Sequence, residues 1–245
     1  MLSEMQAIKE IREYAPLEIP ITMRIRFRKV GDLQYISHLD LQRTVQRILV
    51  RAGVPVWYTQ GFNPHMKIVF STPLSIGAES ICEMLDIRLD GDISCEEMVA
   101  CLNEQVTDEL RILDAYIPET KFSDIVWSEY EIAVQTPLLT TSTVDTLYKV
   151  LNSAELLVTK KTKSGGKTVN VIPLVRDFHA EFDESLGRLQ IKTLLRADGE
   201  YYLNPELFLL ALHDACGILA GEENEILYSI LRIENYLEDG ITVFR

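Results

Sequence analysis

The order of hydrophobic repeats along the chain constrains its fold more than any other feature. Apolar residues that alternate with polar ones are typical of half-buried strands, whereas an apolar stripe at 3.6-residue spacing is typical of helices. Residues 21–118 follow the order β-α-β-(β)-β-α-β, and residues 127–245 repeat that pattern. We therefore predict an α+β protein with two tandem ferredoxin-like domains, each a split β-α-β unit with an antiparallel sheet. Residues 1–20 are an N-terminal extension, in which residues 3–14 are predicted to form a short helix.

The composition is that of a globular protein. The chain has 245 residues, of which 47% are hydrophobic and 25% are charged. No window approaches the roughly 18 to 20 unbroken apolar residues of a membrane span, and no signal peptide is recognised. The expected compartment is the cytoplasm, without membrane contact. The four cysteines have no C-x-x-C spacing, so they are expected to be small apolar residues, and neither a cofactor nor a metal site is predicted.

Charge is distributed unevenly along the sequence. The formal net charge is −13, yet residues 23–72 hold eight basic and two acidic residues. An acidic protein is not expected to coat DNA non-specifically, but a local anion site is compatible with it because salt screens charges beyond about 8 Å. Alternatively, the basic runs are solvated faces balanced by nearby acids. A second basic run, over residues 159–176, contributes Lys160, Lys161, Lys163 and Lys167.

The best-defined helix is predicted over residues 37–52, with Ser37 as its N-cap and Gly53 at its end. Its buried stripe consists of Leu41, Val45, Ile48, Leu49 and Ala52. Three arginines four residues apart fall within an arc of about 80° that faces away from this stripe. They are Arg43, Arg47 and Arg51.

The strand before this helix is predicted over residues 21–30, where apolar and basic residues alternate. Its exposed face is expected to carry three guanidinium groups in a row, those of Arg24, Arg26 and Arg28.

Two polar segments, residues 35–40 and 60–67, flank this helix and the strand after it, and are expected to meet at one end of the sheet. A helix N-terminus favours anions, so the segments predict a phosphate or carboxylate pocket. Helix capping explains Ser37 and Asp40 completely and is the favoured explanation of these two residues, and Asn63-Pro64 is more typical of a turn than of a binding site. The anion-binding candidates are Arg24, Arg26, Arg28, His38, Arg43, Arg47, Asn63, His65 and Lys67.

The two histidines suggest alternative chemistries. Histidine as a residue type is suited to general acid and base catalysis, so His38 and His65 are candidates for such chemistry on a phosphodiester, with Asp40 as a third candidate. The same three residues are potential metal ligands, and their spacing selects neither alternative. The chain has no G-x-x-x-x-G-K-S/T, G-x-G-x-x-G or G-x-S-x-G motif.

Aromatic residues are interleaved with the first basic run, as in proteins that stack unpaired bases beside arginines. Core packing is expected to use at least half of them. Trp57 and Tyr58 are adjacent in a predicted strand over residues 54–59, so their rings should face opposite ways. The set comprises Phe27, Tyr35, Trp57, Tyr58, Phe62 and Phe70.

Five motifs together resemble the radical-SAM-linked domain family of bacteria, whose members occur alone or fused behind a radical SAM enzyme. They are Arg26-Phe27-Arg28-Lys29-Val30-Gly31, Ser37-His38-Leu39-Asp40-Leu41, Arg51-Ala52-Gly53-Val54-Pro55, Gln60-Gly61-Phe62-Asn63-Pro64-His65 and Pro73-Leu74-Ser75-Ile76-Gly77. The resemblance implies partnership with a radical SAM protein, in RNA or ribosome-related modification. The chain lacks C-x-x-x-C-x-x-C, so it is not itself expected to be the radical enzyme.

Three functions are consistent with these features. The first is a binding module that presents RNA, or another phosphorylated substrate, to a radical SAM partner. The second is a metal-independent ribonuclease or phosphodiester transferase that uses His38 and His65. The third is an adaptor that binds only protein through its acidic second half. We favour the first and lean against an enzyme.

Overall fold

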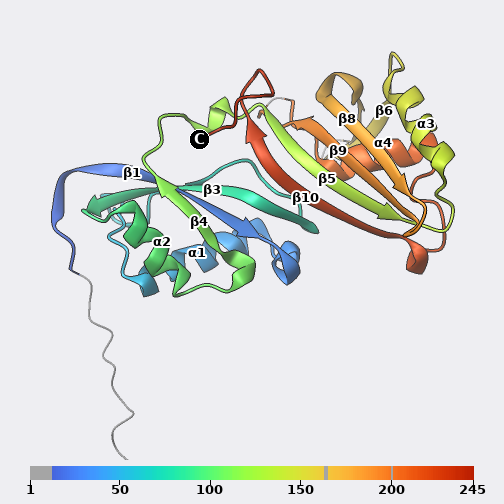
Figure 1. The fold of residues 1–245 in the computed structure, drawn as a ribbon. Helices are drawn as coiled ribbons and strands as arrows, with labels where there is room; N and C mark the ends of the chain where they lie inside the picture. Colours follow the sequence, from blue (N-terminus) through green and yellow to red (C-terminus); the bar gives the residue numbers. More distant parts are fainter. Residues whose placement is uncertain (1–12, 163–164, 200) are drawn as a thin grey trace, which may run out of the picture. The chain divides into compact units, whose positions relative to one another are not determined.

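The computed structural model describes residues 13–162, 165–199 and 201–245 (Figure 1). Within these ranges, four α-helices accompany a mostly antiparallel set of strands, which confirms the predicted α+β class. The predicted helix over residues 3–14 falls almost wholly outside the described residues. None of the helices in the described ranges is long and apolar enough to cross a membrane.

The chain divides into two compact units. Unit 1 comprises Met1–Phe27, Ser37–Phe70 and Met84–Pro118. Unit 2 comprises Arg28–Ile36, Ser71–Glu83 and Glu119–Arg245. The residues of two strands, β1 (Pro16–Lys29) and β3 (Ala78–Gly91), are therefore divided between the units.

Unit 1 builds its sheet in the order β4-β1-β3-β2, and the register of β1 with β4 and of β2 with β3 is antiparallel. Helices α1 and α2 cover one face of this sheet (Figure 1). Besides β1 and β3, the elements are α1 (His38–Ala52), β2 (Ile68–Phe70), α2 (Cys95–Asn103) and β4 (Ile112–Tyr116). Phe27, Leu49, Leu85 and Leu102 bring the sheet and both helices into one apolar core.

Helix α1 confirms its sequence prediction in detail. The Ser37 hydroxyl accepts a hydrogen bond from the Asp40 backbone N–H at 3.1 Å and donates one to the Asp40 carboxylate at 2.7 Å. Gly53 ends the helix in the left-handed conformation, at φ 70°. The buried residues of the helix are the five predicted from 3.6-residue spacing. Its arginines therefore face away from the core.

Two strand predictions in unit 1 need correction. Residues 54–59 do not form a continuous strand, since only Val56 and Tyr58 make isolated bridges, to Leu89 and Met66. Pro55 interrupts the segment because it lacks a backbone N–H donor. β1 begins at Pro16 rather than at residue 21, and prolines are tolerated there because the register with β4 covers only the later part of β1.

Unit 2 builds its sheet in the order β10-β5-β9-β8 with antiparallel neighbours, and the first residues of β3 pair with β10 in parallel. Residues 175–183 pair with residues 188–195 in an antiparallel register. The elements are β5 (Trp127–Gln135), α3 (Thr141–Leu151), β6 (Leu157–Thr162), β7 (Gly165–Asn170), β8 (Val175–Asp183), β9 (Arg188–Arg196), α4 (Pro205–Cys216) and β10 (Leu227–Tyr236). Short 3₁₀ helices are Gly31–Tyr35, Asp108–Leu110, Phe122–Asp124, Ile172–Leu174 and Glu223–Glu225.

A polar cluster is buried in unit 2. Arg232 has no exposed surface, forms an ion pair with Glu83, and donates to the Thr72 hydroxyl at 2.8 Å. The Lys29 ammonium is also buried and donates to the Leu33 and Ala78 carbonyl groups, each at 3.1 Å. Buried charges need such partners because desolvation is costly. The cluster therefore ties Arg232 of the unit 2 sheet to Glu83 and Thr72, and ties Lys29 to Leu33 and Ala78.

Candidate functional site

An open groove of about 670 Å³ lies in unit 1 between α1 and the segment of residues 58–66. We call it the arginine groove. Its helix wall presents Arg43, Gln46, Arg47, Val50 and Arg51, which recur every three or four residues along one face of α1. Its loop wall is formed by Tyr58, Pro64, His65 and Met66.

The electrostatics of the groove favour an anion. All three arginines are exposed, and no acidic residue lines the groove in the part of the chain that is described. Arg43 approaches Asp40 at 3.4 Å, but both side chains are about 60% exposed, so this pair neutralises little. Arg51 donates to the Gln105 carbonyl at 3.2 Å. Like charges four residues apart disfavour a helix, so the row of arginines does not by itself stabilise α1.

The loop wall positions one histidine. Thr59 and His65 are joined by a backbone hydrogen bond of 2.9 Å, and the Thr59 hydroxyl accepts from the His65 backbone N–H at 3.1 Å. The His65 Nδ1 atom lies 3.0 Å from that hydroxyl and 3.4 Å from the Asn63 carbonyl oxygen. Because a carbonyl oxygen only accepts, the contact favours a proton on Nδ1. The Nε2 atom of the neutral ring is then left as an acceptor for a ligand.

Two aromatic rings belong to the segment of residues 58–66. Tyr58 lines the groove and is 41% exposed, and Phe62 at the loop tip is fully exposed. Phe62 makes no ring contact with any described residue. Gly61 precedes it at φ 139°, a conformation that favours glycine. A fully exposed aromatic ring is typical of a surface that stacks on a partner.

The structure brings together some of the predicted site residues and separates others. Arg43, Arg47 and His65 share the arginine groove, but His38 does not line it. His38 is exposed, its Nε2 atom lies 3.1 Å from the Gln42 amide nitrogen, and its ring centroid is 5.3 Å from that of Phe70. Asn63 is exposed at the loop tip, and Lys67 lines a different pocket.

The expectation that β1 exposes three guanidinium groups is wrong. Arg24 is completely buried, and its Nε and Nη2 atoms donate to the two carboxylate oxygens of Asp86 at 2.7 and 2.9 Å. Arg26 and Arg28 are half-buried. The bidentate contact with Asp86 neutralises the charge of Arg24 within unit 1. The two-residue period of β1 gave the correct face for Arg24, but a carboxylate from β3 covers it.

The second basic run forms the β6–β7 hairpin of unit 2. Lys160 lies directly across from Lys167, and both are exposed. Like charges in this position weaken a hairpin unless an anion lies between them. Lys161 lies across from Gly166, and Lys163 lies outside the described residues.

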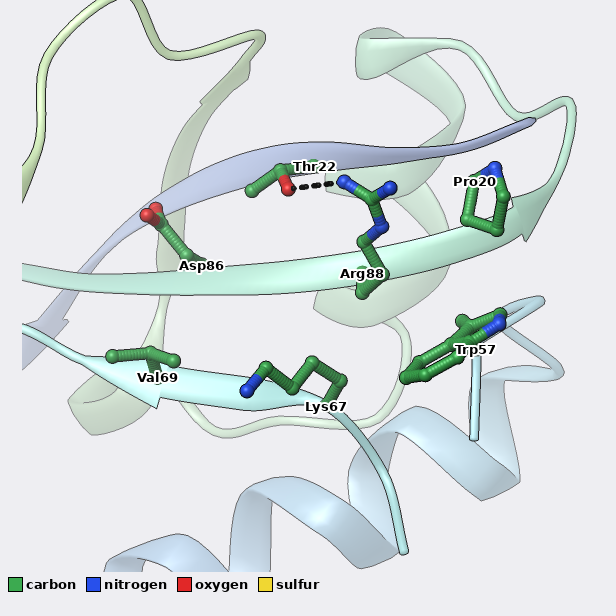
Figure 2. Close-up of a pocket in the computed structure, with 7 residues that line it drawn as sticks. All are labelled: Pro20, Thr22, Trp57, Lys67, Val69, Asp86 and Arg88. Atoms are coloured by element: carbon green, nitrogen blue, oxygen red, sulfur yellow. Dashed lines mark hydrogen bonds between the residues drawn. The ribbon is translucent and has the colours of Figure 1, made fainter. Parts of the chain in front are cut away.

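A separate pocket of about 540 Å³ in unit 1 was not anticipated from the sequence as a site (Figure 2). It is lined by Pro20, Thr22, Trp57, Lys67, Val69, Asp86 and Arg88. We call it the tryptophan pocket. The alternation of apolar and polar residues in β3 placed Asp86 and Arg88 on one face, so that alternation was the available signal. Trp57 and Tyr58 face opposite ways as predicted, the former into this pocket and the latter into the arginine groove.

The metal-site alternative for the histidines is not borne out by the geometry. Across the described ranges, no three histidine, cysteine, aspartate or glutamate side chains gather in a group that could hold a metal ion. His38, Asp40 and His65 are thus not assembled as ligands, and Asp40 is engaged with Ser37 and Arg43.

Comparison with protein-family models matches residues 22–205 to a family described as "Uncharacterized protein conserved in bacteria (DUF2344)". The match spans well over half of the chain and includes both walls of the arginine groove and the whole tryptophan pocket except Pro20. No curated protein matches the chain.

Proposed function

The chain belongs to the DUF2344 family of bacterial proteins, and we propose that it is an RNA-binding module whose arginine groove neutralises phosphate groups. The observation that carries this proposal is the composition of the groove. Arg43, Arg47 and Arg51 face an open hollow without an acidic lining residue among those described, and the aromatic ring of Tyr58 also lines it.

The groove is better suited to an unpaired RNA segment than to a duplex. Single-stranded RNA offers unstacked bases that aromatic rings and guanidinium planes can stack on. Tyr58 inside the groove and Phe62 at its loop supply two such rings. Arginines at one-turn intervals, about 6 Å apart along the helix axis, are matched to successive backbone phosphates. In this proposal His65 Nε2 accepts a hydrogen bond from a base or a ribose hydroxyl.

The proposed partner is a radical SAM enzyme, in the cytoplasm, and the chain would present RNA to it for modification. The support is the resemblance of five motifs to the radical-SAM-linked domain family, among them Ser37-His38-Leu39-Asp40-Leu41. The described cysteines are free thiols, as in a reducing compartment. Co-purification of the tagged chain from nuclease-treated extract should recover a protein with a C-x-x-x-C-x-x-C motif. Recovery of other proteins without it would contradict the partnership.

We also propose that each unit is a ferredoxin-like domain. The sheet orders support it, because both place the fourth, first, third and second strands of a split β-α-β unit side by side. Those orders are β4-β1-β3-β2 in unit 1 and β10-β5-β9-β8 in unit 2. A sheet of this type leaves one face free of helices.

The RNA proposal is tested by fluorescence anisotropy with a labelled stem-loop at 50 and 200 mM salt. Binding should weaken with salt, since each neutralised phosphate of a single strand contributes a slope of about −0.7. The Arg43→Glu/Arg47→Glu variant should bind at least tenfold more weakly, with a shallower slope. Arg111→Glu is the matched control, because Arg111 is exposed in unit 1 outside the groove. Binding that is absent at 50 mM salt, or equal in both variants, would contradict the proposal.

The ribonuclease alternative can be separated from binding. Acid–base cleavage of a phosphodiester needs two positioned groups, and the groove receives His65 without His38. Incubation of the pure protein with RNA in EDTA should therefore leave the RNA intact. Cleavage by the wild type that is lost in His65→Ala would make the protein an enzyme.

A further inference from the structure

We propose that the tryptophan pocket is a nucleotide-binding site. The base would stack on the Trp57 indole, and the phosphate would lie between Lys67 and Arg88. This site is separate from the arginine groove and does not depend on it. Two features support this site: the backbone fixes these three residues relative to one another, and the charges of Lys67 and Arg88 are unmet.

Three backbone hydrogen bonds hold the ligand-facing residues in a closed ring. The N–H of Trp57 donates to the Arg88 carbonyl at 2.8 Å, that of Arg88 to the Lys67 carbonyl at 3.0 Å, and that of Lys67 to the Trp57 carbonyl at 3.2 Å. Each residue is thereby both donor and acceptor. The indole, ammonium and guanidinium groups come from different segments, yet their Cα atoms are fixed relative to one another. Pre-positioned groups of this kind lower the entropy cost of binding.

The charge in the pocket is not satisfied by the described residues. The Lys67 side chain is exposed and forms no ion pair or hydrogen bond with any of them. The Arg88 guanidinium donates only to the Thr22 hydroxyl, at 3.3 Å (Figure 2). Asp86 is the one carboxylate among the lining residues, and the buried Arg24 already binds both of its oxygens. Two cations therefore remain for an anionic ligand.

The uncharged walls fit a planar ring. Trp57 is half-buried, and Pro20 and Val69 add apolar surface nearby. Figure 2 shows Trp57 at one end of the hollow, with Lys67 and Arg88 next to it and Asp86 at the opposite end. A volume of about 540 Å³ lies within the range of small-molecule sites. A cation-lined pocket with one exposed indole face is suited to a heteroaromatic ring that carries phosphate.

AMP is the probe for this pocket. It combines one heteroaromatic ring, for the Trp57 indole, with one phosphate group, for the ammonium of Lys67 and the guanidinium of Arg88. The Asp86 carboxylate at the opposite end is bound through both oxygens to Arg24, so its charge is already neutralised.

The test uses the intrinsic fluorescence of Trp57. The chain has two tryptophans, and Trp127 is buried in unit 2, so it contributes a constant background. AMP should quench the emission in a saturable way, and equilibrium dialysis with labelled AMP should give the same affinity. In dialysis, Trp57→Leu and Lys67→Gln should each lower the affinity for AMP at least tenfold. Trp57→Phe should lower that affinity by a smaller factor. Arg111→Gln is the control, and thermal unfolding of every variant identifies those that fail to fold.

Two arms distinguish a free nucleotide from one residue of an RNA chain. Saturable AMP binding that is lost in Lys67→Gln supports a free nucleotide. If a hexa-adenylate quenches Trp57 but AMP does not, the pocket binds one base of an RNA strand. In that case the quenching should be retained in Arg43→Glu/Arg47→Glu and lost in Lys67→Gln. If neither ligand quenches Trp57, or if binding is unchanged in Trp57→Leu and Lys67→Gln, the inference is overturned. AMP binding alongside a failed stem-loop assay would overturn only the proposed RNA groove.

Discussion

Two rows of arginines, predicted from the same kind of pattern, have opposite environments in this protein. Those of β1 lie in a sheet, and the first of them, Arg24, is completely buried against Asp86. Those of α1 are exposed along the arginine groove, where Arg43 has only a weak contact with Asp40. Periodicity identified the polar face of each element correctly. Only the tertiary structure determines whether another element covers that face.

Buried and exposed arginines also differ in what they require from their surroundings. A buried guanidinium is tied to a partner because desolvation penalises an unpaired ion by several kcal/mol. An exposed one on a helix has no such requirement and is available to a ligand. Substitutions in the two rows should therefore affect different measurements.

The largest effect is expected for Arg24→Met. It leaves the Asp86 carboxylate without its bidentate partner in a mostly buried position, at 19% side-chain exposure. The free energy of unfolding should fall by about 3 kcal/mol, measured by urea denaturation. The Arg24→Met/Asp86→Leu double variant is the control, and it should recover most of the loss because the unpaired carboxylate is gone. A single variant as stable as the wild type would mean that the pair is not structural.

Buried ionisable groups should also appear in the pH dependence of stability. Burial raises the pKa of the Cys82 thiol from 9.0 to about 12. Above pH 9 the unfolded chain releases this proton while the folded chain keeps it, so the free energy of unfolding falls as pH rises. The contribution is about 1 kcal/mol between pH 8 and pH 10.

Cys82→Ala isolates that contribution. Burial lowers the pKa of Lys29, which gives the opposite slope in the same window, but this effect is common to both proteins. The wild type should therefore lose more stability than Cys82→Ala between pH 8 and pH 10 in urea titrations. Equal losses would show that the thiol ionises alike in both states.

A smaller effect on stability is expected at the N-terminus of α1, the helix that carries the exposed arginines. Ser37→Ala removes the N-cap that accepts from the Asp40 N–H, and caps of this kind contribute about 1 kcal/mol. The free energy of unfolding should fall by that amount, and Ser37→Asp should restore most of it. A cap variant with unchanged stability would indicate that tertiary packing alone fixes the first turn.

The smallest stability effect is expected for Arg47→Ala. The Arg47 side chain is exposed and has no ion pair or hydrogen bond within the described residues. The free energy of unfolding should therefore change by less than about 0.5 kcal/mol. The same variant should weaken stem-loop binding severalfold. A stability loss as large as that of Arg24→Met would erase the distinction between the two rows.

Sequence reasoning succeeded where one element determines the outcome. The cap, the end and all five buried positions of α1 follow from local chemistry and the period of the helix. The α+β class and the order of elements also follow from the alternation of repeats.

It was less successful where distant segments meet. Asp86 is 62 residues from Arg24 in the sequence, and no local pattern in β1 predicts that the two side chains pair. His65 and Lys67 are two residues apart, yet they line different hollows because residues 58–66 form a loop whose side chains do not keep strand alternation. No sequence pattern connects Arg88 to Trp57, since their proximity depends on the tertiary fold.

The ring of hydrogen bonds among Trp57, Lys67 and Arg88 has a consequence for how such a protein can diversify. Trp57 and Lys67 are bonded to each other and to β3, so both ends of the intervening loop are anchored whatever its length. Insertions or replacements between them would reshape the loop wall of the arginine groove and leave the tryptophan pocket unaltered. The loop wall of the arginine groove can thus change in sequence and length while the tryptophan pocket keeps its geometry.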